Sequence, residues 1–202
     1  MKKITKHKRP PKFLRDFQVH YPKRTYEDIN GEFRNQIKRY LINEQFGLCC
    51  YCMKKIRPEN SHNEHFIPRS KAPELSLDYR NLFASCNGFK DQRENCGHKK
   101  NNWFDSSLTI SPLDSFCEKT FIYGMDGTIS SYSPSGQEMI QQLELNNPLL
   151  IKARKTAIYE YLADEYLDED TAEDYIHDLY YPIGGELEPF CMAIIYQIKK
   201  QF

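Results

Sequence analysis

Residues 49–100 read CCYCMKKIRPENSHNEHFIPRSKAPELSLDYRNLFASCNGFKDQRENCGHKK, a cysteine- and turn-rich segment with few long apolar runs. Its Cys-x-x-Cys step, from Cys49 to Cys52, holds two thiolates in a tight turn at the spacing that a tetrahedral zinc ion needs. Cys86 and Cys96 follow downstream and complete a set of four. Buried free cysteines are the alternative, but small apolar roles do not explain clustering in a segment so short of core residues. We therefore predict a structural zinc site, with Cys50, Cys117 and Cys191 outside it.

The cysteine count and the N-terminus argue against a disulfide framework. Seven cysteines are an odd number, and residues 1–11 are basic without the apolar stretch of a secretory signal. In a reducing compartment, clustered cysteines bind metal more often than they form disulfides. The sequence also lacks an apolar run near the length that a bilayer span requires. These features favour a soluble, cytoplasmic protein with no membrane partner.

Charge is distributed very unevenly along the chain, although the formal net charge is zero. Residues 1–104 carry 22 lysines and arginines against 11 acidic residues, whereas residues 105–202 carry 6 against 17. The first half suits a polyanion such as a nucleic acid, and the second half would repel one. Two merely solvated surfaces are the alternative interpretation.

A carboxylate and an imidazole stand side by side between the cysteine pairs, at Glu64 and His65. Consecutive side chains of a strand point to opposite faces, so these two can take different roles. Glu64 can bind a hard divalent cation that stabilises the phosphorane and the departing 3′ oxygen of a phosphodiester. Neutral His65 can deprotonate a water molecule around neutral pH. A lone Glu-His pair is usually a surface coincidence, but its place inside the cysteine frame favours a catalytic site.

Local patterns outside this segment predict a mixed architecture. Residues 1–24 have little periodicity and are expected to form a basic extended arm. Thr25 and Asp28 resemble a capping box, after which apolar residues follow at helical spacing until Gly47. Residues 120–130 indicate a hairpin that turns at Asp126-Gly127. Residues 140–162 indicate one or two helices broken near Pro148, and residues 190–198 a buried terminal helix. We expect an α+β core over residues 25–110, followed by a hairpin and a mostly helical region over residues 111–202.

Five short motifs of the segment together carry a resemblance. They are Cys-x-Tyr-Cys at 49–52, Glu-His-Phe-x-Pro at 64–68, Tyr-x-Asn-Leu at 79–82, Ser-Cys at 85–86 and Cys-Gly-His-Lys-Lys-Asn at 96–101. In this order they resemble an HNH endonuclease of the Septu and retron-associated anti-phage type. The resemblance implies a ββα-metal fold, in which two short strands and a helix present the active site to a groove of DNA.

The resemblance also implies a role for each matching residue. His65 corresponds to the catalytic histidine that activates water, and Glu64 to the acidic metal ligand before it. Asn81 corresponds to the middle residue of the motif, whose amide holds a loop and thereby orients His65. His98 corresponds to the third residue, which closes the catalytic metal site. Asn87 remains a rival for that position, because Cys86-Asn87-Gly-Phe-Lys imitates the ending found in shorter members.

Four basic residues beside this site, Lys90, Arg93, Lys99 and Lys100, are candidates for contact with phosphates. Exposed lysines are common, so simple solvation is the alternative for each of them.

The sequence thus predicts a DNase that uses Mg²⁺ or Mn²⁺ for catalysis and Zn²⁺ for structure. The resemblance further implies a complex with an ABC-type ATPase. Two copies of this chain can form a homodimer within that complex. Such an ATPase is needed for any energy input, because the chain has no phosphate-binding Gly-x-x-x-x-Gly-Lys-Ser/Thr loop. The acidic second half is the expected docking surface. Two alternatives remain, a toxin-like RNase and a zinc-finger-like module that binds nucleic acid without cutting it.

Overall fold

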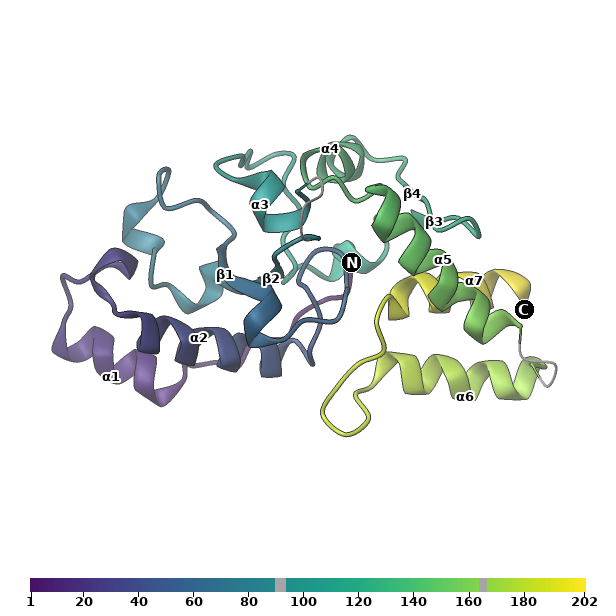
Figure 1. Ribbon diagram of the computed structural model, residues 1–202, viewed down its shortest axis with the longest axis horizontal. Helices are drawn as coiled ribbons and strands as arrows, with labels where there is room; N and C mark the ends of the chain where they lie inside the picture. Colours follow the sequence, from purple (N-terminus) through teal and green to yellow (C-terminus); the bar gives the residue numbers. More distant parts are fainter. Residues whose placement is uncertain (90–93, 164–166) are drawn as a thin grey trace.

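The computed structural model describes residues 1–89, 94–163 and 167–202, and its elements are mainly short helices with two small sheets (Figure 1). The described strands are β1 Ser61–His65, β2 Leu82–Cys86, β3 Ile122–Tyr123 and β4 Ile129–Ser130. The described helices are α1 Lys12–His20, α2 Gly31–Glu44, α3 Cys96–Lys100, α4 Pro134–Gln142, α5 Pro148–Leu162, α6 Glu169–Tyr180 and α7 Cys191–Gln201. Single turns of 3-10 helix lie at Tyr26–Asp28, Pro58–Asn60, Pro73–Leu75, Tyr79–Asn81 and Ser115–Glu118. The expected mixed architecture is confirmed.

Two antiparallel strands form the centre of the first half. β1 pairs with β2 in the register His62↔Ser85, Glu64↔Phe83 and His65↔Leu82. Every residue of β2 is buried, whereas in β1 His62 and Asn63 are half-buried and the other three residues are buried. The long α2 helix packs its buried face against both strands. The pairing with β2 and the packing on α2 therefore fix the direction in which each β1 side chain points.

Helix α2 begins later than the sequence pattern predicts. The capping box of Thr25 and Asp28 is present, but it closes only the 3-10 turn Tyr26–Asp28. Asn30 then caps α2 by accepting a hydrogen bond from the backbone N–H of Phe33. The helix ends at Glu44, three residues before the predicted stop at Gly47, whose φ of +78° lies in the left-handed region that glycine tolerates.

The N-terminal arm is not extended over its whole length, because Lys12–His20 forms helix α1. Leu14 is buried there, and Phe13 and Phe17 pack their rings on Phe33 of α2 at centroid distances of 5.6 and 4.8 Å. Packing of these aromatic rings supplies the stabilisation that the local sequence lacks. Residues before the helix also pack on the protein, and the N–H of Ile4 donates to the carbonyl oxygen of Pro112.

The second half surrounds the buried helix α7, which packs on α5, α6 and β3 (Figure 1). The predicted hairpin and terminal helix are confirmed, as is the break between α4 and α5 before Pro148. Arg154 of α5 is fully buried and donates to the carbonyl oxygens of Gly127 and Leu145, which ties the helix to the β3–β4 hairpin. Among the helices that the structure describes, none is long and apolar enough to span a membrane.

Candidate active site

Four cysteine sulfurs gather at the junction of the hairpin and α3. Cys49 and Cys52 lie in the loop after α2, Cys86 ends β2 and Cys96 begins α3, and all four Sγ atoms lie within 4.8 Å of one another. The Asn95 amide donates to the Cys96 sulfur at 3.1 Å, and the backbone N–H of Cys86 donates to the Cys49 sulfur at 3.3 Å. Donors of this kind favour thiolates over thiols. The donor set therefore fits a structural Zn²⁺ ion.

The cysteine cluster places α3 against the hairpin. The first residue of α3 donates its backbone N–H to Leu143, and the next, Gly97, donates to the Ser85 hydroxyl of β2 at 3.1 Å. The three remaining cysteines, Cys50, Cys117 and Cys191, are buried outside the cluster. A side chain at position 97 would displace its neighbours, because a Cβ there would lie 2.4 Å from Oε2 of Glu64 and 2.5 Å from Nε2 of His62.

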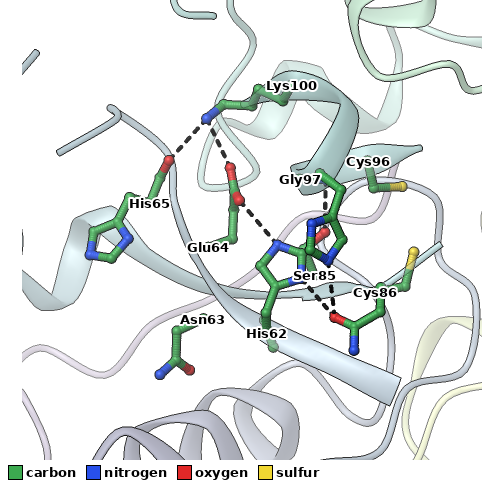
Figure 2. Close-up of polar contacts among 12 residues, drawn as sticks. His62, Asn63, Glu64, His65, Ser85, Cys86, Cys96, Gly97 and Lys100 are labelled. Carbon is green, nitrogen blue, oxygen red and sulfur yellow. Dashed lines mark hydrogen bonds and ion pairs between the residues drawn. The ribbon is translucent and has the colours of Figure 1, made fainter. Parts of the chain in front are cut away.

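The carboxylate of Glu64 is buried and fully engaged (Figure 2). Its Oε1 atom accepts from the Lys100 ammonium at 2.8 Å and from the Tyr51 hydroxyl at 3.1 Å. Its Oε2 atom faces Nε2 of His62 at 3.4 Å. Burial alone would raise the pKa of Glu64, but the hydrogen bond from His62 and the charge of Lys100 outweigh it and lower that pKa. The Glu64 carboxylate is therefore ionised at neutral pH.

The His65 imidazole points away from Glu64, as the alternation of a strand requires (Figure 2). Its Nε2 lies 2.9 Å from the carbonyl oxygen of Ser76, and its ring meets the Tyr26 ring edge-on at 4.8 Å. Because a carbonyl can only accept, Nε2 carries the proton and Nδ1 keeps a basic lone pair. Burial is the main reason that the pKa of His65 falls to about 4, so the ring is neutral around pH 7.

Asn81 holds the loop that follows His65. Its Oδ1 atom accepts from the backbone N–H of Ile67 at 2.7 Å, and its Nδ2 atom donates to the carbonyls of Ile67 and Leu75 at 3.0 and 3.2 Å. The residue after Leu75 is Ser76, whose carbonyl binds the His65 ring. These bonds link Asn81 to the orientation of His65.

His98 and Asn87 lie together rather than apart. The Asn87 Oδ1 atom lies 3.4 Å from Nε2 of His98 and 2.9 Å from Nδ1 of His62. The His62 and His98 rings are 4.3 Å apart between centroids. His62 is not among the site residues that the sequence predicts, although its position two residues before Glu64 puts both side chains on one face of β1.

Several of the candidate site residues line one shallow hollow. It has a volume of about 210 Å³, and its walls include Glu64, His65, Arg69, His98 and Asn102. Within the described ranges, the four cysteines are the only group of three or more Cys, His, Asp or Glu with all ligand atoms this close. Glu64 and His98 line the same hollow, but their ligand atoms do not belong to a group of three that lies this close together.

Lys100 requires a correction to the predicted phosphate contacts. Its ammonium is buried, with 1% of the side chain exposed, and it binds Glu64 and the carbonyl oxygen of His65 at 2.9 Å. It is therefore unavailable to a phosphate and instead supports the site from within. Lys99 is half-exposed and lies 3.9 Å from the Glu144 carboxylate. Lys90 and Arg93 lie outside the described residues.

Comparison with known proteins gives partial support for a nuclease. No protein-family model matches the sequence. Over 101 residues the chain is 33% identical to the Escherichia coli protein named "Retron Ec83 putative HNH endonuclease". The match covers 44% of this chain and 38% of that protein. This similarity supports an HNH nuclease, and the mixed helix and small-sheet fold with its four-cysteine cluster fits an HNH-type fold.

Proposed function

We propose that this chain is a metal-dependent endonuclease of the HNH type that hydrolyses phosphodiester bonds of DNA. The observation that carries the proposal is the placement of Glu64 and His65 on opposite sides of one strand, both lining a single hollow. The strand begins opposite Cys86 of the four-cysteine cluster, next to a short helix, and we propose that this unit is a ββα-metal core. A module that only binds nucleic acid has no need of such a buried, ionised Glu beside a neutral His.

The proposed mechanism assigns one task to each side chain. His65 accepts a proton from the attacking water at Nδ1, because Nε2 is committed to the Ser76 carbonyl. Asn81 fixes, through its hydrogen bonds to the backbone, the loop that orients this ring. Glu64 and His98 would hold the catalytic cation, and an ionised carboxylate with a nearby imidazole suits Mn²⁺ as well as Mg²⁺. When bound, that cation supplies Lewis-acid stabilisation of the charge that develops on the phosphate and the leaving oxygen.

Charge supports nucleic acid as the substrate and a protein as the partner. Arg69 lines the hollow, and the basic half of the sequence contains the whole proposed core. Helix α6 exposes a row of acidic side chains on the other half, Glu169, Asp170, Glu173, Asp174 and Asp178. We propose that this acidic face, rather than the hollow, docks a partner, and that the partner is an ABC-type ATPase of an anti-phage defence complex.

The proposal is tested by incubating the zinc-loaded protein with supercoiled plasmid and with RNA, with and without Mg²⁺ or Mn²⁺. The same reactions are run with the protein encoded by the neighbouring gene. We expect metal-dependent nicking or linearisation of the plasmid. Cleavage of RNA alone would indicate a toxin-like RNase instead. Tight nucleic-acid binding without cleavage of either substrate in any of these reactions would replace the enzyme with a binding module.

A further inference from the structure

The side chain of His62 lies at Oε2 of Glu64, the carboxylate oxygen that Lys100 and Tyr51 do not bind. Lys100 and Tyr51 both bind Oε1, which leaves Oε2 facing the His62 ring. His62 Nε2 is 3.4 Å from that oxygen. Two ligands of one transition-metal ion, each about 2.0 to 2.2 Å from it, are separated by about 3 to 3.5 Å. The observed separation matches a pair of ligands that share an ion (Figure 2).

The other nitrogen of the His62 ring fixes its tautomer. Nδ1 lies 2.9 Å from Oδ1 of Asn87, an amide oxygen that can only accept, so Nδ1 carries the proton. Nε2 faces the carboxylate oxygen at 3.4 Å. Without metal a proton on Nε2 joins the two atoms as a hydrogen bond, and a metal cation bound between them would take the place of that proton. Imidazoles that bind metals commonly donate their second N–H to an oxygen in this way. Asn87 is therefore placed to orient a ligand rather than to be one.

Neighbouring backbone and a second imidazole enclose the same space. Gly97 approaches both His62 and Glu64 so closely that a Cβ there would force their side chains to shift. His98 comes next in α3 and packs its ring against that of His62. A carboxylate oxygen with two imidazoles is a donor set that favours Mn²⁺ and heavier transition ions over Mg²⁺.

We propose that His62 is a direct protein ligand of the catalytic cation, beside Glu64 and His98, and that it makes the site select Mn²⁺ over Mg²⁺. This inference rests on the proposed function, because it adds a ligand to the metal site assigned there.

The test measures metal binding by the full-length, zinc-loaded chain rather than its activity. Mn²⁺ is titrated calorimetrically into the wild type, His62→Gln and the control His20→Ala. Gln can still donate a hydrogen bond to Glu64 but offers no imidazole, so it separates a ligand from a hydrogen-bond donor. His20 lies at the end of α1 and binds the carbonyl oxygen of Asp16 in its own helix. We expect His62→Gln to weaken Mn²⁺ binding at least about tenfold and His20→Ala to leave it unchanged.

A spectroscopic measurement on the wild type keeps the inference testable even if the variant misfolds. Pulsed electron paramagnetic resonance of bound Mn²⁺ should show nitrogen coupling from two imidazoles, reduced to one in His62→Gln. Coupling from a single imidazole in the wild type, or Mn²⁺ affinity of His62→Gln within about threefold of the wild type, would overturn the role of His62. A parallel titration of Glu64→Gln separates the two proposals. If Glu64→Gln loses Mn²⁺ binding and His62→Gln keeps it, only the present inference fails. If Glu64→Gln also keeps it, the metal site of the proposed function fails as well.

Discussion

Replacing Gly97 by alanine should disturb the Glu64 carboxylate while leaving the cysteine cluster intact. The new Cβ would lie 2.4 Å from Oε2 of Glu64, whereas ordinary contact begins at 3.4 Å, so the carboxylate must move by about 1 Å. It cannot move freely, because Lys100 and Tyr51 hold the other oxygen at 2.8 and 3.1 Å. The His62 ring, 2.5 Å from the same Cβ, must also shift.

The cost follows from the contacts that are lost. Breaking one hydrogen bond to a charged group costs about 1.5 to 3 kcal/mol. Reduced freedom of the unfolded chain returns about 0.4 to 1 kcal/mol, because Gly97 has no left-handed backbone that alanine would strain. We therefore expect Gly97→Ala to lower the free energy of unfolding by about 1 to 2 kcal/mol. It should also weaken Mn²⁺ binding, without loss of zinc.

Urea denaturation in excess zinc measures this change, with Gly31→Ala as the matched control. Gly31 is also a helical glycine, but a Cβ there would meet nothing within 4 Å. We expect Gly31→Ala to leave stability unchanged or raise it by up to about 1 kcal/mol. The reasoning is refuted if Gly97→Ala is as stable as Gly31→Ala and binds Mn²⁺ like the wild type.

Three further changes test the supporting contacts. Lys100→Met removes the partner of the buried Glu64 carboxylate and should lower the free energy of unfolding, measured in urea, by about 3 to 5 kcal/mol. Its control, Lys99→Met at a half-exposed neighbour, should change that free energy by less than about 0.5 kcal/mol. Equal effects of the two substitutions would contradict the role assigned to burial. Cys52→Ser should lose zinc and unfold, and Cys50→Ser should keep its zinc, as judged by metal analysis and circular dichroism. Full zinc content in the first variant would remove that cysteine from the ligand set. Asn81→Ala should lower the free energy of unfolding by about 2 to 4 kcal/mol, because three hydrogen bonds are lost and a backbone N–H is left unpaired; a loss below about 0.5 kcal/mol would show that the loop does not depend on it.

Spacing along the chain was sufficient to predict the cysteine cluster and the strand that carries Glu64. A Cys-x-x-Cys turn restricts its own geometry, and alternation in a strand separates neighbouring side chains whatever surrounds them. The turn at Asp126-Gly127 was predictable for the same reason, since Gly127 adopts a φ of +85°. Within the Cys-x-x-Cys step, the strand and the turn, the local sequence alone determines the geometry, whereas Cys86 and Cys96 reach the cluster through the fold.

Features that depend on tertiary contacts were not predictable. Lys100 looks like any surface lysine in the sequence, and its burial is decided by Glu64 on a strand far back in the chain. Helix α1 gains its stability from rings on α2, so its own residues gave little sign of it. His62 shares a face of β1 with Glu64, but its contact with Gly97 of α3 arises only in the folded chain.

The most direct test of the account is the rate of plasmid cleavage by His65→Ala compared with the wild type, in Mn²⁺ and at equal zinc content. The account predicts that the variant folds, keeps its zinc and loses about two to four orders of magnitude in rate, because the neutral imidazole that accepts the proton is gone. Circular dichroism and metal analysis confirm that the two proteins are comparable. Cleavage by His65→Ala at a rate close to that of the wild type would contradict the assignment of the general base and with it the proposed active site.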